Sequence, residues 1–183
     1  MTLLEWFSKG LTYQEYVDQM TVNREEMLSI DERIHLSEDD QNFLQSYQSK
    51  QWRVIILTAD WCGDAMLCVP ILKRMAEVAH FDLRFLHRDE NLELMDQYLT
   101  NGKSRSIPKF IFIDDQGVEQ AVWGPRAVEV QLLVDQMQSE LPNQEDPQFK
   151  EKQKEMYQAF RDKISSDPKI WQSVICSLRQ LLS

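Results

Sequence analysis

Arg53-Val-Ile-Ile-Leu-Thr58 leads directly into Ala59-Asp-Trp-Cys-Gly-Asp-Ala65, and this junction decides the fold. The first segment is a continuous apolar run with β-branched residues, typical of a strand that is covered on both faces. From Asp60 to His80, apolar side chains recur every three or four residues, which predicts a long helix with one apolar face. Pro70 lies inside that helix and should kink it. A buried strand that runs into a helix indicates an α/β protein.

The segments that follow alternate in the same way. The pattern predicts a strand at 81–86, a helix at 91–100, a strand at 109–114, a hairpin turn into a strand at 118–123, and a helix from Pro125 to Leu141. The order β-α-β-α-β-β-α implies a parallel pair of strands joined by a helix and then an antiparallel hairpin. We therefore predict an α/β sandwich.

Helical patterns flank this region on both sides. Before it we expect helices at 13–20, 24–34 and 38–48, the last capped by Ser37 with Asp40 three residues later. After a polar, proline-bounded break at 142–147 we expect helices at 149–164 and 168–182. The predicted organisation is a helical N-terminal extension (1–50), an α/β domain (51–141) and a helical C-terminal tail (142–183).

Composition excludes several classes of function. The chain has 30 acidic and 20 basic side chains, a net charge of −10, and no Lys/Arg stripe, so nucleic acid is not an expected partner. It has no apolar run of about 18 residues and no secretory signal pattern in residues 1–10, so we expect a cytoplasmic protein without a membrane partner. Three cysteines, an odd number, give no pattern of stapling disulfides.

The motif Asp60-Trp-Cys-Gly-Asp-Ala65 resembles the Trp-Cys-Gly-Pro-Cys active site of thioredoxins with two substitutions. Four further features stand where that family has them: Pro70, Ile107-Pro108, Gly117 and Gly124. The resemblance implies a thioredoxin-like α/β/α sandwich with helical N- and C-terminal extensions. More narrowly, Trp61-Cys-Gly-Asp64, Arg88–Asn91, Met95–Gly102 and Trp123-Gly-Pro-Arg126 resemble a bacterial thioredoxin-like family with a helical N-terminal extension.

The resemblance also implies a site. Cys62 would be the catalytic thiol, and the cis-proline of the family would hold the Ser106–Ile107 backbone open beside it for an extended peptide. The groove residues carried over from the motifs are Trp61, Gly63, Asp64, Ile107, Pro108, Trp123, Gly124 and Arg126.

Two departures from the family pattern concern the chemistry. The second cysteine, which resolves a mixed disulfide, is Ala65 here, and the acidic residue five positions before the motif's Trp is Ile56. Cys68 is a poor substitute, because six helical residues separate it from Cys62 by roughly 9 Å along the axis, whereas a disulfide needs Cα atoms within about 7 Å. We expect Cys68 to be a buried apolar residue, and Cys176 to be buried within its own apolar helix.

Two charges bear on the reactivity of Cys62. The start of a helix favours a thiolate, whereas a carboxylate at Asp64 raises the thiol pKa if it points inward. Arg126 is either solvated or paired with an anion across the groove, Asp64 or the Cys62 thiolate.

The predicted function is thiol–disulfide exchange through the single thiol of Cys62, with a protein or a low-molecular-weight thiol as partner, so a possible oxidoreductase. The alternative is a non-catalytic module that binds a peptide in the same groove.

A third reading, a monothiol glutaredoxin that holds an iron–sulfur cluster, is disfavoured by Trp61 and the thioredoxin-like spacing. Peroxidase chemistry is disfavoured because Thr58 lies four residues before Cys62, not three. The three histidines show no metal-site spacing with the cysteines, and glycine-rich nucleotide loops are lacking, so we expect no metal and no cofactor.

Overall fold

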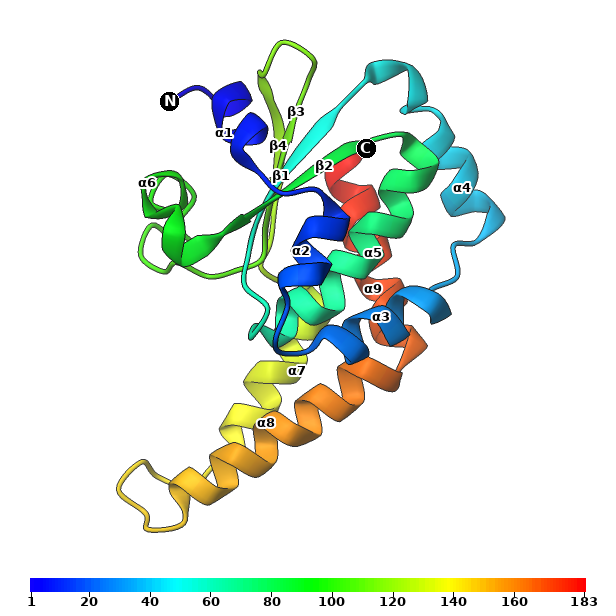
Figure 1. Cartoon of the computed structure of the whole chain (residues 1–183). Coiled ribbons are helices and arrows are strands. Elements are labelled where there is room, and N and C mark those ends of the chain that lie inside the picture. The colour runs from blue at the N-terminus through cyan, green and yellow to red at the C-terminus, as the bar shows by residue number, and fades with distance from the viewer.

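The centre of the molecule is a four-stranded sheet in the order β2-β1-β3-β4 (Figure 1). The computed structural model describes all 183 residues. The strands are β1 (Arg53–Thr58), β2 (Asp82–His87), β3 (Lys109–Ile113) and β4 (Glu119–Trp123). β1 runs parallel to β2 and antiparallel to β3, and β4 closes the hairpin with β3. Residues 54–58 of β1 are all buried, as expected of a strand that is covered on both faces.

Helices cover both faces of this sheet. Figure 1 shows α5 (Gly63–Ala79) and α9 (Pro168–Leu182) on one side, with α1 (Leu3–Lys9) and α6 (Leu92–Met95) on the other. α5 is the helix predicted after β1, and most of its residues are buried around Pro70. The α/β/α architecture with helical extensions is therefore confirmed.

The N-terminal extension also contains α2 (Tyr13–Gln19), α3 (Arg24–Arg33) and α4 (Glu38–Gln45). The predicted cap at Ser37 is present: its hydroxyl accepts the backbone N–H of Asp40, and the Asp40 carboxylate accepts the N–H of Ser37. Thr2 and Thr12 cap α1 and α2 in the same manner. α3 and α4 pack against α5, so the extension supports the helix that directly follows Cys62.

α7 (Val128–Ser139) and α8 (Phe149–Ser166) form a helical hairpin that protrudes from the body, with the loop 140–148 at its tip (Figure 1). α9 returns to the body and packs against α5, α7 and β4. One hydrophobic core includes side chains from all three predicted parts of the chain, such as Trp6, Ile56 and Trp171. The boundaries at residues 50 and 141 stay predictions, because the three parts pack together.

The structure differs from the expected elements in several places. The helix expected at 38–48 ends at Gln45, and the helix expected from Asp60 begins at Gly63. α1 was not predicted. The helix expected at 91–100 ends at Met95, because the chain turns back and Thr100 pairs with Ser104. The helix expected from Pro125 begins at Val128, because the backbone of Ala127 is still extended. The prediction that Cys176 is buried is wrong.

Cys176 is exposed because other residues of α9 occupy its buried side. Those core-facing residues are Trp171, Val174, Ile175, Leu178 and Leu182.

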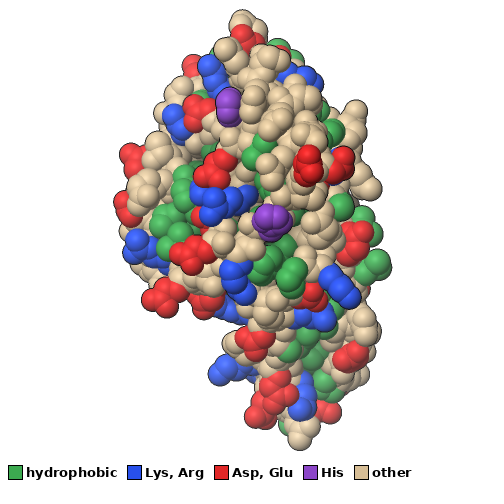
Figure 2. Space-filling view, turned by 90° about the vertical axis from the view of Figure 1, so that its right-hand side faces the viewer, with side chains coloured by type: hydrophobic (Ala, Val, Ile, Leu, Met, Phe, Trp, Pro, Cys, Tyr) green, Lys and Arg blue, Asp and Glu red, His purple; other side chains and the backbone are tan.

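Charged side chains of both signs are interspersed over the face shown in Figure 2, and the basic ones form no continuous stripe there. None of the helices combines the length and the hydropathy needed to span a bilayer.

Candidate functional site

Cys62 occupies the position before the first turn of α5, four residues after the last residue of β1. Its side chain is buried apart from a small opening, and the residue is 8% exposed. The Sγ atom lies 3.4 Å from the carbonyl oxygen of Ile107, to which the thiol donates a hydrogen bond. That carbonyl belongs to the residue before Pro108, and the Ile107–Pro108 peptide is cis. Two segments 45 residues apart thus meet at the thiol.

The surroundings of Cys62 favour the protonated thiol. Burial, joined by the carboxylate of Asp64, raises the pKa of Cys62 to about 11. The backbone N–H groups of Ala65 and Asp64 and the charge of Arg126 act in the opposite direction but do not cancel the rise. At neutral pH only about one thiol in ten thousand is ionised at such a pKa. Burial, together with the inward-facing Asp64, therefore outweighs the helix N-terminus, which favours the thiolate.

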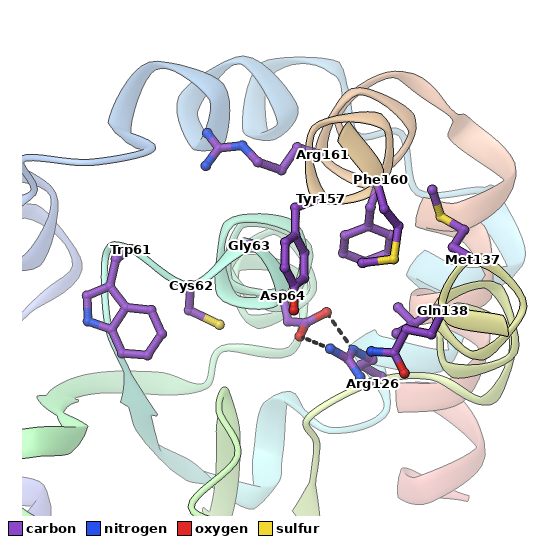
Figure 3. Close-up of a pocket in the computed structure, with 12 residues that line it drawn as sticks. Trp61, Cys62, Gly63, Asp64, Arg126, Met137, Gln138, Tyr157, Phe160 and Arg161 are labelled. Carbon is purple, nitrogen blue, oxygen red and sulfur yellow. Dashed lines mark hydrogen bonds and ion pairs between the residues drawn. The ribbon is translucent and has the colours of Figure 1, made fainter. Parts of the chain in front are cut away.

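Asp64 and Arg126 form a two-bond ion pair beside this thiol (Figure 3). Nε of Arg126 donates to Oδ1 of Asp64 at 2.8 Å, and Nη2 lies 2.8 Å from Oδ2. Nη1 donates to Oε1 of Gln131 at 2.9 Å, which fixes the guanidinium from the α7 side. Burial raises the pKa of Asp64, and the Arg126 charge offsets part of that rise. Of the alternatives left open by the sequence, pairing with Asp64 is the one observed.

A cavity of about 360 Å³ opens next to Cys62, between α7 and α8. Val134 and Met137 of α7 and Met156 and Phe160 of α8 form its apolar wall. Figure 3 shows Tyr157 and Phe160 directed from α8 toward the space beside the Asp64–Arg126 pair, with Arg161 above Trp61 and Cys62. The cavity combines an apolar wall with one ion pair and one thiol, the usual composition of a ligand-binding site.

A second, smaller depression of about 220 Å³ also borders Cys62. Arg88, Ser106, Ile107 and Pro125 border it. The residues that line both depressions are Trp61, Cys62, Asp64 and Arg126. The two depressions therefore form one groove that passes the thiol.

Trp61 stands at the rim of this groove. It is 50% exposed, and the guanidinium of Arg88 lies over its ring at 4.9 Å from the centroid. A large aromatic side chain so exposed next to a cavity is a common feature of binding surfaces.

The loop that carries Trp61 and Cys62 is held by the N-terminal extension. Oδ2 of Asp60 accepts hydrogen bonds from the backbone N–H groups of Thr21 and Val22, at 2.8 and 3.1 Å. The side chain of Asn23 donates to the backbone oxygen of Asp60 at 2.8 Å and also accepts from Arg161 of α8. Asn23 thus links the loop to the helix that forms the other side of the cavity.

Five of the predicted groove residues line the depressions: Trp61, Gly63, Asp64, Ile107 and Arg126. Trp123 instead stacks on Phe110 in the core and donates from Nε1 to the hydroxyl of Ser177 at 2.9 Å. Pro108 is buried and lines neither depression. Gly124 has a φ of +119°, and a Cβ there would meet the carbonyl oxygen of Pro108 at 2.1 Å. Pro108, Trp123 and Gly124 therefore shape the fold around the groove without bordering it.

Sequence reasoning missed the contribution of α8. Met156, Phe160 and Ile164 recur every four residues and indicate an apolar face, but the pattern does not say what that face covers. Met156 and Phe160 border the cavity, whereas Ile164 is fully buried. The role of Asp60 in holding this loop could not be predicted either, because its partners lie 38 and 39 residues away along the chain.

The cysteines make no disulfide with one another. All three are free, and Cys68 is buried at 1% exposure on α5, as expected. Ala65 occupies the position of a resolving cysteine and is also buried. No group of three or more His, Cys, Asp or Glu side chains is arranged to hold a metal ion. Any exchange chemistry of this site would therefore use one sulfur only.

Three comparisons with known proteins bear on this fold. Among solved structures, a protein of unknown function from Pseudomonas aeruginosa superposes with a TM-score of 0.68 at 14% identity, covering 98% of each chain. An HIV epitope-scaffold superposes with a TM-score of 0.71 at 12% identity, covering 100% of this chain and 98% of the other. At such identities the likeness concerns the fold alone. The search of curated proteins gave no match. A protein-family model described as thioredoxin matches residues 10–138, well over half of the sequence, and the chain therefore belongs to the thioredoxin family.

Proposed function

We propose that this protein binds an extended peptide segment of a protein partner in the groove at Cys62, without catalysing disulfide turnover. The observation that carries the proposal is that the surroundings of Cys62 favour the protonated thiol. Sγ of Cys62 donates to the Ile107 carbonyl, and its pKa is raised to about 11. A catalytic thiol needs a substantial thiolate fraction near neutral pH, which this environment opposes. The resolving position is Ala65, so a mixed disulfide could not be released from within the chain.

The backbone beside Cys62 supports peptide binding. Ser106 lies between the last bridge of the preceding loop and β3, and neither its N–H nor its carbonyl bonds to another backbone group. A free donor and a free acceptor on one residue can pair with an extended chain in the manner of an added strand. Ser106 borders the groove together with Ile107, so a segment paired there would pass directly over the thiol.

Slow exchange through the single thiol of Cys62 is the second candidate. One observation favours it: Sγ is directed into the opening at the start of α5, where the N–H groups of Asp64 and Ala65 lower the thiol pKa. A partner that carries a disulfide on the bound segment would bring it next to Sγ. The resolving thiol would then come from the partner or from a low-molecular-weight thiol.

The pH dependence of alkylation separates these two functions. Cys176 is exposed on α9 and serves as an internal control in the unmodified chain. A thiol pKa about two units above the usual 9.0 lowers the thiolate fraction at pH 7 about 100-fold. Each thiolate is more nucleophilic at the higher pKa, which raises the alkylation rate again by about tenfold. We therefore expect Cys62 to react with iodoacetamide about tenfold more slowly than Cys176 at pH 7, measured by peptide mass spectrometry.

The rate at Cys62 should continue to rise above pH 9. A plateau below pH 8, or reaction faster than at Cys176, would contradict the binding module and favour exchange. Turnover gives a second readout: the protein should not reduce insulin with a reductase, and Ala65→Cys should raise that activity at least modestly. The gain should be limited because Ile56 and Asp64 remain.

A further inference from the structure

We infer that the cavity between α7 and α8 receives one large apolar side chain of the bound segment, and that this segment carries acidic residues next to that anchor. The inference rests on the proposed function and specifies the partner that the groove selects. The anchor would be Leu, Met or Phe.

The wall of the cavity favours an apolar anchor side chain. Met137 and Met156 face the space from opposite helices, next to Val134 and Phe160. Methionine side chains are flexible and polarizable, so they adapt to apolar side chains of different shape. A volume of about 360 Å³ lies at the small end of ligand pockets, and an apolar side chain placed there would be removed from water.

The charges around the groove favour acidic residues next to the anchor. Three arginines line it, Arg88, Arg126 and Arg161, against one carboxylate, Asp64, although the whole chain has a net charge of −10. Asp64 already pairs with Arg126 in two bonds, and Arg88 pairs with Asp89 and donates to the backbone oxygen of Arg105. Of the three arginines, Arg161 is therefore the one whose guanidinium is paired least completely.

Arg161 retains donors for such a partner. Its Nη2 bonds to Asn23 and lies 3.5 Å from a carboxylate oxygen of Glu26, while Nε and Nη1 have no acceptor in the chain. Figure 3 shows its guanidinium above the opening between Trp61 and Cys62. An acidic side chain of the segment could accept these N–H groups, and basic residues there would be repelled.

The same segment can reach both depressions, since they share Trp61, Cys62, Asp64 and Arg126. One half would pair with Ser106, and the other would place its anchor between α7 and α8. The family match ends at residue 138, so the α8 side of the anchor site lies outside the matched region. The C-terminal tail therefore adds specificity to a groove formed by the thioredoxin domain.

The test uses labelled nine-residue peptides with Leu, Met, Phe or Ala at the centre, and with either Asp or Lys as its neighbours. Binding to the full chain is measured by fluorescence anisotropy, and slower alkylation of Cys62 reports that the peptide lies over the thiol. We expect peptides with Leu, Met or Phe between aspartates to bind at least about tenfold more tightly than the Ala peptide, from burial of the anchor. Lysine neighbours should weaken binding.

Met156→Trp should fill the cavity and abolish the preference for a large centre, so that the Leu and Ala peptides bind alike. Val134→Phe fills it from the α7 side if Met156→Trp does not fold. Gln158→Trp, on the exposed side of α8, is the matched control and should change neither peptide. Equal binding of Leu and Ala peptides that both protect Cys62 would overturn the anchor site and leave the proposed function standing. If no peptide protects Cys62, the proposed function falls and the anchor site with it.

Discussion

α8 and α9 follow one another in the tail and differ in what their apolar faces contact. α9 buries five large side chains against α5, α7 and β4. α8 buries three, and two of these, Met156 and Phe160, border a cavity. Both helices lie beyond the region that matches the thioredoxin family.

The difference indicates two roles for one tail. α9 completes the core on the face of the sheet that carries Trp123, since Ser177 accepts the indole N–H and the helix packs on β4. α8 is held in place by polar links, Arg161 with Asn23 and Arg33 with the backbone of Ser165, and its apolar face remains partly available. We therefore expect substitutions in α9 to change stability, and substitutions in α8 to change mainly the properties of the groove.

The largest effect is expected at Trp171. Its side chain is buried, and Nε1 donates to the carbonyl oxygen of Ile164 at 2.7 Å. Trp171→Ala should lower the free energy of unfolding by about 3–5 kcal/mol, because it leaves a cavity in the core and an unpaired carbonyl. Urea denaturation followed by far-UV circular dichroism measures the loss. A loss below about 1 kcal/mol would mean that α9 is not part of the core.

The next effect is expected at Phe160, on the α8 side of the cavity. Phe160→Ala should admit water toward Cys62 and lower the thiol pKa from its value of about 11, because burial is the main cause of the raised pKa. The alkylation rate of Cys62 at pH 7 should rise severalfold, while that of Cys176 stays constant. Stability should fall by less than in Trp171→Ala, because Phe160 already borders empty space. An unchanged rate would show that α8 does not shield the thiol.

A smaller change is expected from the charge beside the thiol. Asp64→Asn removes the carboxylate that raises the pKa of Cys62, so the thiolate fraction at pH 7 and the alkylation rate should both rise, by about threefold to tenfold. Arg126 loses its ion-pair partner in this variant, so a loss of stability of about 1–3 kcal/mol should accompany the faster reaction. Glu151→Gln, an exposed carboxylate on α8, is the control for removal of one negative charge. A slower reaction of Asp64→Asn would contradict the assignment of Asp64 as the opposing charge.

The sequence predicted the part of the site that is local in the chain. β1, α5 and the cysteine motif follow one another within 27 residues, and their patterns fix strand, helix and the position of Cys62 at the helix start. The pairing of Arg126 with Asp64 was one of several alternatives that the sequence left open, beside a solvated arginine and a contact with the Cys62 thiolate. The cavity could not be predicted, because it depends on how α8 crosses the start of α5. That crossing is set by Asn23, Asp60 and Arg161, whose contacts join residues 37 and 138 positions apart.

The smallest effect on stability, and the sharpest contrast between the two helices, is expected from a matched pair of exposed residues. Tyr157 of α8 is 52% exposed and Leu181 of α9 is 37% exposed. Alanine at either position should change the free energy of unfolding by no more than about 0.5–1 kcal/mol, because neither side chain is part of the buried core.

The two variants should nevertheless differ in binding. Tyr157 faces the cavity beside the Asp64–Arg126 pair (Figure 3). Leu181 lines neither depression. Tyr157→Ala should weaken binding of the aspartate-flanked Leu peptide by about threefold or more, since an aromatic side chain at the rim provides contact area at low entropic cost. Leu181→Ala should leave the dissociation constant unchanged. Equal binding by both variants, with both proteins as stable as the parent, would mean that the exposed face of α8 is no more involved in recognition than that of α9.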